Sequence, residues 1–124
     1  MKKKILIVED HEDLIKYMQS FFKDSYQTLS VKHGDEALEL AVKEVPDLMI
    51  IDLVDYEVDS LEAIQEVREN PKTRSIPIIA ITAGLHDTIE HEGVSIDFND
   101  YIAKPFLDEE LSSCIDKLLK QESS

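Results

Sequence analysis

The residues best suited to chemistry in this 124-residue chain come directly after four short apolar runs. They are Glu9, Asp10, Asp52, Thr82 and Lys104. Carboxylates brought close together repel one another, and a divalent cation removes that repulsion. Mg²⁺ suits such a site because it prefers oxygen ligands and needs only one or two carboxylates beside a phosphoryl group.

Together these side chains predict a site for phosphoryl transfer. Asp52 can be the nucleophile, since carboxylates form acyl phosphates. The ammonium of Lys104 and the hydroxyl of Thr82 can each donate to a phosphoryl oxygen. A bound Mg²⁺ can neutralise the charge of the group in transfer. Catalysis would then consist mostly of positioning and electrostatics.

Each of these residues also has a structural interpretation when taken singly. Glu9 and Asp10 can be acids at the start of a helix, where the helix dipole favours them. Asp52 can be a capped or salt-bridged acid, Thr82 a turn hydroxyl, and Lys104 an ordinary surface lysine. Their shared position at the ends of apolar runs favours a functional interpretation for the group.

The bulk properties of the chain exclude several classes of function. A formal net charge of −14 argues against binding nucleic acid through its phosphates or adsorbing to an anionic membrane surface. The single cysteine, Cys114, cannot form an internal disulfide, which indicates a reducing compartment. No apolar run approaches the roughly 20 residues that span a bilayer, and the one after the basic N-terminus is too short for a signal peptide. We therefore expect a cytoplasmic protein.

The hydrophobic pattern predicts the elements that position the polar residues. A continuous apolar run at residues 48–51 is typical of a strand buried on both faces. Strands are expected at 5–8, 26–31 (an edge strand), 48–52, 76–81 and within 96–103. Helices are expected at 11–23, 34–44, from a cap at Asp59 or Ser60 to about residue 70, at 84–93 and at 107–120. This alternation predicts an α/β fold with a doubly wound parallel sheet, whose ligands bind at the carboxyl ends of the strands.

Four segments of the chain resemble the receiver domains of two-component response regulators, the family of the chemotaxis regulator that controls flagellar motors. They are ILIVED (5–10), LMIID (48–52), IAITA (79–83) and YIAKPF (101–106). The resemblance covers essentially the whole chain. It implies a flavodoxin-like fold, with a five-stranded parallel sheet of strand order 2-1-3-4-5 and five helices.

The resemblance assigns roles to individual residues. It implies that Asp52 accepts a phosphoryl group in a reaction that requires Mg²⁺ or Mn²⁺. Asp10, Asp52 and the backbone carbonyl of Val54 would bind the metal, with Glu9 in the outer part of the site. Lys104 would contact the phosphoryl oxygens.

A switch is implied as well. Thr82 would contact the phosphoryl group and move toward it, and Tyr101 would turn inward behind it. The Lys104–Pro105 peptide bond, with Pro105 as the second residue, is expected to be cis.

The loop after Asp52 departs from the family. Asp55-Tyr56 and Ser60 stand where Met-Pro and a later Gly are usual. The added acids of this loop, Asp55, Glu57 and Asp59, favour a solvated acidic segment over extra metal ligands. Val54 and Gly84 flank the path that the resemblance implies for the hydrolytic water, and neither side chain can hydrogen-bond a water. We therefore expect a long-lived aspartyl phosphate.

The resemblance also implies the partners. A histidine kinase or histidine phosphotransfer protein would dock on the first helix and the Lys104-Pro105 loop, with His11, Leu14 and Pro105 as candidate contacts. The output partner or domain is not indicated, and a phosphorylation-dependent dimer is possible. We expect a receiver domain over residues 1–121 and a frayed tail over 122–124. The chain would be either a solitary receiver or a piece of a larger regulator or hybrid kinase.

Three classes of function compete. The first is a signalling module that catalyses only its own phosphorylation and slow dephosphorylation, and is otherwise not an enzyme. The second is a flavin- or nucleotide-binding module of the same architecture. Its first loop, Glu9 to Glu12, lacks the Gly or hydroxyl residues that cradle a phosphate and has the wrong charge. The third is a degenerate receiver that binds partners without being phosphorylated.

Overall fold

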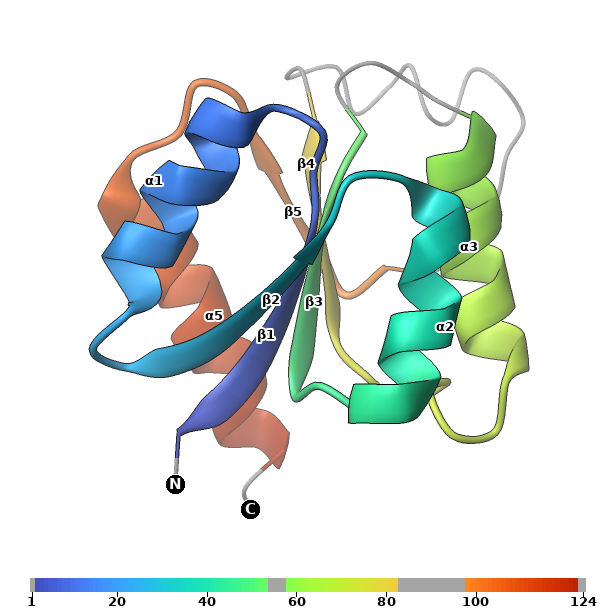
Figure 1. Cartoon of the computed structure of the whole chain (residues 1–124). Helices are drawn as coiled ribbons and strands as arrows, with labels where there is room; N and C mark the ends of the chain where they lie inside the picture. Colours follow the sequence, from blue (N-terminus) through green and yellow to red (C-terminus); the bar gives the residue numbers. More distant parts are fainter. Residues whose placement is uncertain (1, 54–57, 83–97, 123–124) are drawn as a thin grey trace.

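A five-stranded parallel sheet forms the centre of the protein (Figure 1). The computed structural model describes residues 2–53, 58–82 and 98–122. The strands are β1 (Lys3–Val8), β2 (Tyr26–Val31), β3 (Leu48–Asp52), β4 (Ile78–Thr82) and β5 (Asp100–Ala103). Their spatial order is β2-β1-β3-β4-β5, which confirms the predicted fold class and places β2 at one edge.

Helices cover both faces of the sheet in the part of the chain that the structure describes. They are α1 (Glu12–Phe22), α2 (Gly34–Glu44), α3 (Val58–Glu69) and α5 (Asp108–Glu122). In Figure 1, α1 and α5 lie on one face and α2 and α3 on the other. The helix predicted over residues 84–93 lies outside the described residues. None of the described helices is long and apolar enough to cross a membrane.

The side chains of each strand alternate between these two layers, because successive residues of a strand point to opposite faces. In β1, Ile5 and Ile7 belong to the cluster formed with α1 and α5. Leu6 and Val8 belong to the cluster formed with α2 and α3. Burial on both faces explains why the strand sequences are continuously apolar rather than alternating.

The register of the sheet brings the polar residues together at one edge. Val8 of β1 lies beside Ile51 of β3, and Thr82 of β4 lies beside Ala103 of β5. The residues that follow these positions therefore reach the same level. The side chains brought to this carboxyl edge are those of Glu9, Asp52, Thr82 and Lys104.

Some predicted boundaries were wrong. Helix α3 begins at Val58, so Asp59 and Ser60 lie within it and neither is its N-cap. Local cap signals place a helix start only to within a residue or two. Helix α5 continues past residue 120 to Glu122, into the segment predicted as a tail.

Strand β5 is shorter than the segment from which it was predicted, since residues 98 and 99 precede it. The side chain of Asn99 replaces the missing strand pairing. Its Oδ1 accepts a hydrogen bond of 2.8 Å from the Ile78 N–H, and its own N–H donates to the Ile78 carbonyl at 2.8 Å.

Candidate functional site

Glu9 is the most deeply buried acid of the described residues, with 2% of its surface exposed. It follows β1 directly, and its N–H donates to the Val31 carbonyl of β2 at 3.0 Å. Its Oε2 accepts hydrogen bonds from the backbone N–H groups of Asp10 (2.9 Å) and His11 (3.2 Å). Its Oε1 has no hydrogen-bond partner. A buried carboxylate oxygen that accepts no hydrogen bond is costly and indicates room for a closer cationic or proton-donating partner.

Lys104 provides the positive charge that the structure places beside these acids. Its Nζ donates to Asp52 Oδ2 at 2.8 Å and lies 3.8 Å from Glu9 Oε1. The Asp52 side chain is 8% exposed and that of Lys104 is 28% exposed, so water screens this pair only in part. The ends of β1, β3 and β5 thus meet in one charged cluster.

The pKa of Glu9 reflects this surrounding. The pKa of Glu9 is raised to about 7 from the ordinary value of 4.5, and burial of the carboxyl group is the largest cause. The neighbouring Asp52 carboxyl raises it further, because it can share a proton with Glu9 and repels its ionised form. The hydrogen bonds with His11 act in the opposite direction. A perturbed acid with a specific charged neighbour is typical of a functional site.

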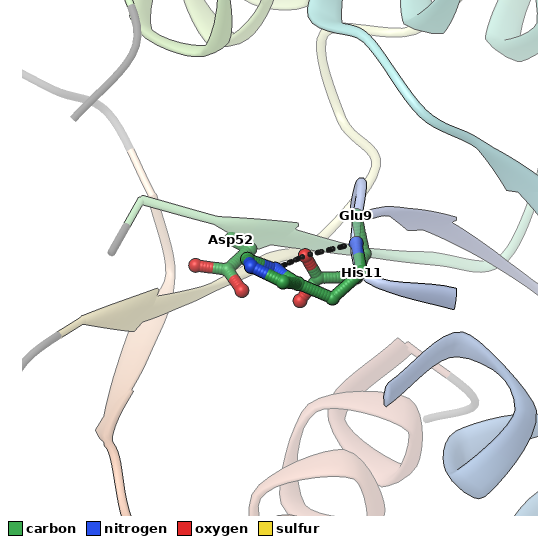
Figure 2. A group of neighbouring side chains, drawn as sticks. All are labelled: Glu9, His11 and Asp52. Atoms are coloured by element: carbon green, nitrogen blue, oxygen red, sulfur yellow. Dashed lines mark hydrogen bonds and ion pairs between the residues drawn. The ribbon is translucent and has the colours of Figure 1, made fainter. Parts of the chain in front are cut away.

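His11 joins the cluster in a way that the sequence interpretation missed (Figure 2). Its Nδ1 lies 3.1 Å from Glu9 Oε2 and 3.1 Å from Asp10 Oδ1. One ligand atom each from Glu9, His11 and Asp52 lie within 4.8 Å of one another. Asp10, a predicted metal ligand, is not in this compact group. The available signal was the position of His11 directly after the Glu9-Asp10 pair.

The remaining predicted residues fall at the same edge or outside the described residues. Thr82 ends β4 and is 3% exposed, and its carbonyl accepts a hydrogen bond of 2.8 Å from the Lys104 N–H. The Lys104–Pro105 peptide bond is cis. Val54, Gly84 and the Asp55-Tyr56 pair lie outside the described residues.

Tyr101, the predicted switch residue, lies on β5 with 43% of its surface exposed. Its ring meets that of Phe98 edge to face, with the ring centroids 6.3 Å apart. Cys114 lies outside the site, on α5. Burial raises the pKa of its thiol to about 12, helped by its contact with Asp100, so it is an inert core residue.

The donor set fits a hard divalent cation. Glu9 and Asp52 offer carboxylate oxygens from a largely buried position, and Asp10 offers another at the mouth of the site. Glu9 Oε1 accepts no hydrogen bond, and its nearest cation, Lys104 Nζ, is 3.8 Å away, so this oxygen has room for a further cationic partner. Mg²⁺ and Mn²⁺ are the ions that carboxylate, carbonyl and water ligands suit.

A groove opens beside this cluster. It has a volume of about 840 Å³ and runs between α1 and the segment after β5. Its apolar and aromatic lining includes Leu14, Tyr17, Pro105 and Phe106.

Comparison with known proteins identifies the family. The family model for the response regulator receiver domain matches residues 5–116. The polar-differentiation response regulator DivK of Brucella anthropi is 36% identical over 110 residues, which cover 85% of this chain and 86% of the relative. The chain therefore belongs to the response regulator receiver domains, as the sequence motifs predicted. It is a receiver domain of two-component signalling.

Other similarities reach into larger proteins. Histidine kinase P4 of Formosa agariphila is 34% identical over 105 residues, which are 85% of this chain but 8% of the relative. The chain spans half or less of the length of several other curated relatives. A crystal structure of the receiver domain of the sensor histidine kinase PA1611 from Pseudomonas aeruginosa matches with a TM-score of 0.86 and 26% identity. The two chains cover 97% and 99% of each other, and that structure has a magnesium ion coordinated in its active-site cleft.

Proposed function

We propose that Asp52 accepts a phosphoryl group from a phosphohistidine of a histidine kinase or histidine phosphotransfer protein. The observation that carries the proposal is the position of Asp52 at the end of β3, with Lys104 Nζ 2.8 Å from its Oδ2. In the reaction an Asp52 oxygen forms a bond to phosphorus as the bond to the histidine nitrogen breaks. The electron pair of that bond returns to the leaving imidazole. The product is an aspartyl phosphate.

The chain's own residues then position and neutralise the transferred group. Lys104 can move its ammonium from the carboxylate to a phosphoryl oxygen, since both lie at the same edge. Thr82 offers a hydroxyl at the end of the neighbouring strand. The activity consists of self-phosphorylation and slow dephosphorylation, and we assign no separate turnover reaction to this chain.

A divalent cation, Mg²⁺ or Mn²⁺, completes the proposed site. Asp10, Asp52 and the Val54 carbonyl would hold it, with Glu9 in the outer part of the site. When bound, it neutralises the negative charge that builds up around the phosphoryl group. The Glu9 oxygen that accepts no hydrogen bond and the magnesium in the PA1611 receiver support this assignment.

Phosphorylation would act on partner binding through Thr82 and Tyr101. The Tyr101 side chain is 43% exposed, and it would turn inward when Thr82 moves toward the phosphoryl group. The surface of β5 and α5 around Tyr101 would then change for an output partner, or for a second copy of the chain in a phosphorylation-dependent dimer.

The groove between α1 and the Lys104-Pro105 segment is the proposed docking site for the phosphodonor protein. His11, Leu14 and Pro105, the predicted contacts, all line it. Apolar groups beside charged rims are typical of protein-binding surfaces.

A kinase partner of this type is consistent with a cytoplasmic location. The charge of −14 argues against nucleic acid and anionic membrane surfaces as direct ligands.

Intact-mass measurement tests the assignment of Asp52. The wild type, treated with a small phosphodonor and Mg²⁺, should gain one phosphoryl adduct that Asp52→Asn abolishes and that chelation of the metal prevents. Asp35→Asn is the matched control, because Asp35 is an exposed acid in the first turn of α2. Equal labelling of the Asp52→Asn variant would defeat the assignment. The absence of an adduct on either protein would favour the degenerate receiver.

The lifetime of the adduct is a second expectation. Val54 and Gly84 provide no side-chain hydrogen bond to a hydrolytic water, so we expect the phosphoryl group to persist for minutes or longer. Its decay can be followed by the same mass measurement after the phosphodonor is removed. Val54→Asn should shorten the lifetime, and a wild-type half-life of seconds would contradict this expectation.

A further inference from the structure

The imidazole of His11 lies where it can serve the metal site directly (Figure 2). One of its ring nitrogens belongs to the group of atoms from Glu9, His11 and Asp52 that lie within 4.8 Å of one another. The backbone N–H of the same residue donates to Glu9 Oε2 at 3.2 Å, which fixes His11 beside that carboxylate. The backbone hydrogen bond of His11 therefore keeps its ring close to the acids.

A helix-capping role does not explain this placement. His11 is the N-cap residue of α1, yet its side chain makes no capping hydrogen bond. The ring turns instead toward the carboxylates of Glu9 and Asp10, with its Nδ1 at 3.1 Å from each. The adjacent Glu9 Oε1 is buried and accepts no hydrogen bond. This oxygen is an independent sign that the cluster is built to take a cation.

Imidazole changes which cations such a site prefers. Mg²⁺ takes oxygen ligands, whereas imidazole nitrogen is a good ligand for zinc, cobalt, nickel and related ions. In the neutral ring one nitrogen carries the proton and the other has a free electron pair. When Nε2 carries the proton, Nδ1 can direct its electron pair to a cation between the carboxylates. The His11 side chain is 57% exposed, so few neighbouring atoms restrict the small rotation of the ring that this would require.

We propose that His11 Nδ1 is a metal ligand, and that the site of Glu9, His11 and Asp52 binds divalent transition-metal ions ahead of Mg²⁺. This inference rests on the proposed metal-dependent function, because it concerns the same site and names the residue that selects the ion. It distinguishes this chain from a site made only of oxygen ligands. Such a site would bind the same ions without any contribution from His11.

Titration calorimetry with Co²⁺ and with Mg²⁺ tests the selection. His11→Ala should weaken Co²⁺ binding by about tenfold or more, the usual order of effect of altering a metal site. It should change Mg²⁺ binding by less than about twofold, because Mg²⁺ does not use the nitrogen. His33→Ala is the matched control, since His33 is likewise an N-cap residue without a side-chain capping hydrogen bond. It should alter neither affinity.

Pulsed electron paramagnetic resonance with Mn²⁺ detects the ligand itself. The wild type and His33→Ala should show the coupling of a directly bound ¹⁴N nucleus, and His11→Ala should lose it. Unchanged Co²⁺ affinity in His11→Ala, or no ¹⁴N coupling in the wild type, would overturn the proposal. An equal loss of Co²⁺ and Mg²⁺ affinity would also overturn it, because it would mean that His11 only positions the acids.

Failure of this inference remains distinguishable from failure of the proposed function. The metal measurements need no phosphodonor, whereas the function is judged by the phosphoryl adduct on Asp52. A wild type that is phosphorylated with Mg²⁺ but shows no nitrogen ligand would retain the function and lose the inference. Far-ultraviolet circular dichroism of each variant would establish that it is folded.

Discussion

The two ends of the sheet differ in how their charged side chains are paired. At the amino ends of the strands, Lys4 Nζ lies 3.1 Å from Glu44 Oε1, and the Lys4 N–H donates to Asp47 Oδ2 at 2.8 Å. At the carboxyl ends, the buried acid Glu9 and the partly buried Asp52 share the ammonium of Lys104. One oxygen of Glu9 accepts no hydrogen bond. The charged groups at the amino end pair with one another, whereas the carboxyl end is the edge at which we propose that a cation and a phosphoryl group bind.

The contrast predicts that removing a charge has opposite effects at the two ends. At the amino end, a deleted charge leaves its former partners without hydrogen bonds, which costs stability. At the carboxyl end, a deleted acid relieves repulsion and desolvation, which stabilises the metal-free protein.

The largest effect is expected at Arg68, near the amino end of β4. Its guanidinium donates to the carbonyls of Arg74 (2.8 Å) and Ile76 (2.7 Å) and to Asn99 Oδ1 (2.6 Å). Arg68→Ala should lower the free energy of unfolding by roughly 3 kcal/mol, because several acceptors lose a charged donor. Urea unfolding measures the change. Arg74→Ala, at an exposed side chain, should stay within about 0.5 kcal/mol of the wild type. Equal losses in both variants would contradict the prediction.

Removing the charge of Glu9 is expected to raise the free energy of unfolding rather than lower it. Its pKa is about 7 in the folded protein against 4.5 in the reference state, so the folded state binds the proton more tightly. The stability from this group is fully present below pH 4.5 and is lost as the pH rises through about 7. Glu9→Gln has no such loss. Above neutral pH and with a chelator present, the variant should be more stable than the wild type, on the order of 2 kcal/mol.

Urea unfolding at a series of pH values checks this difference, which should shrink at acid pH and when Mg²⁺ is added. Glu12→Gln is the control, because Glu12 is an exposed acid whose pKa is lowered by its hydrogen bond from Lys32. It should show no gain at neutral pH. If the free energies of unfolding of Glu9→Gln and the wild type changed with pH in the same way, the raised pKa of Glu9 would be contradicted.

The smallest effect concerns the backbone at the amino end. Val45 follows α2 with φ of 43°, in the left-handed region that a β-branched residue enters at a cost. Its N–H donates to the Ala41 carbonyl at 2.8 Å, and its side chain is largely exposed. Val45→Gly should raise the free energy of unfolding by about 1 kcal/mol, since glycine adopts this conformation freely. Thermal unfolding measures it, and Val45→Ala should gain less. A loss of stability in Val45→Gly would mean that the side chain contributes packing there.

Much of the fold could be read from local patterns. The buried strands were recognisable because residues such as Leu48 to Ile51 are apolar without interruption, which only a sheet covered on both faces requires. The boundaries of β2 and α2 were predicted without error. The start of α3 was not, because several residues near position 58 can cap a helix and such local signals place its start only to within a residue or two.

The sequence by itself determined the order of the strands along the chain, their apolar cores and the polar residue that ends each one. From these follow the α/β class and the family. Only the tertiary structure decided that Glu9 is buried with one oxygen that accepts no hydrogen bond, that Lys104 reaches both acids, and that the His11 ring turns toward the acids rather than capping its helix. The reason is physical. Desolvation and charge pairing depend on segments as far apart as β1 and β5, and only the sheet register brings those segments to one edge.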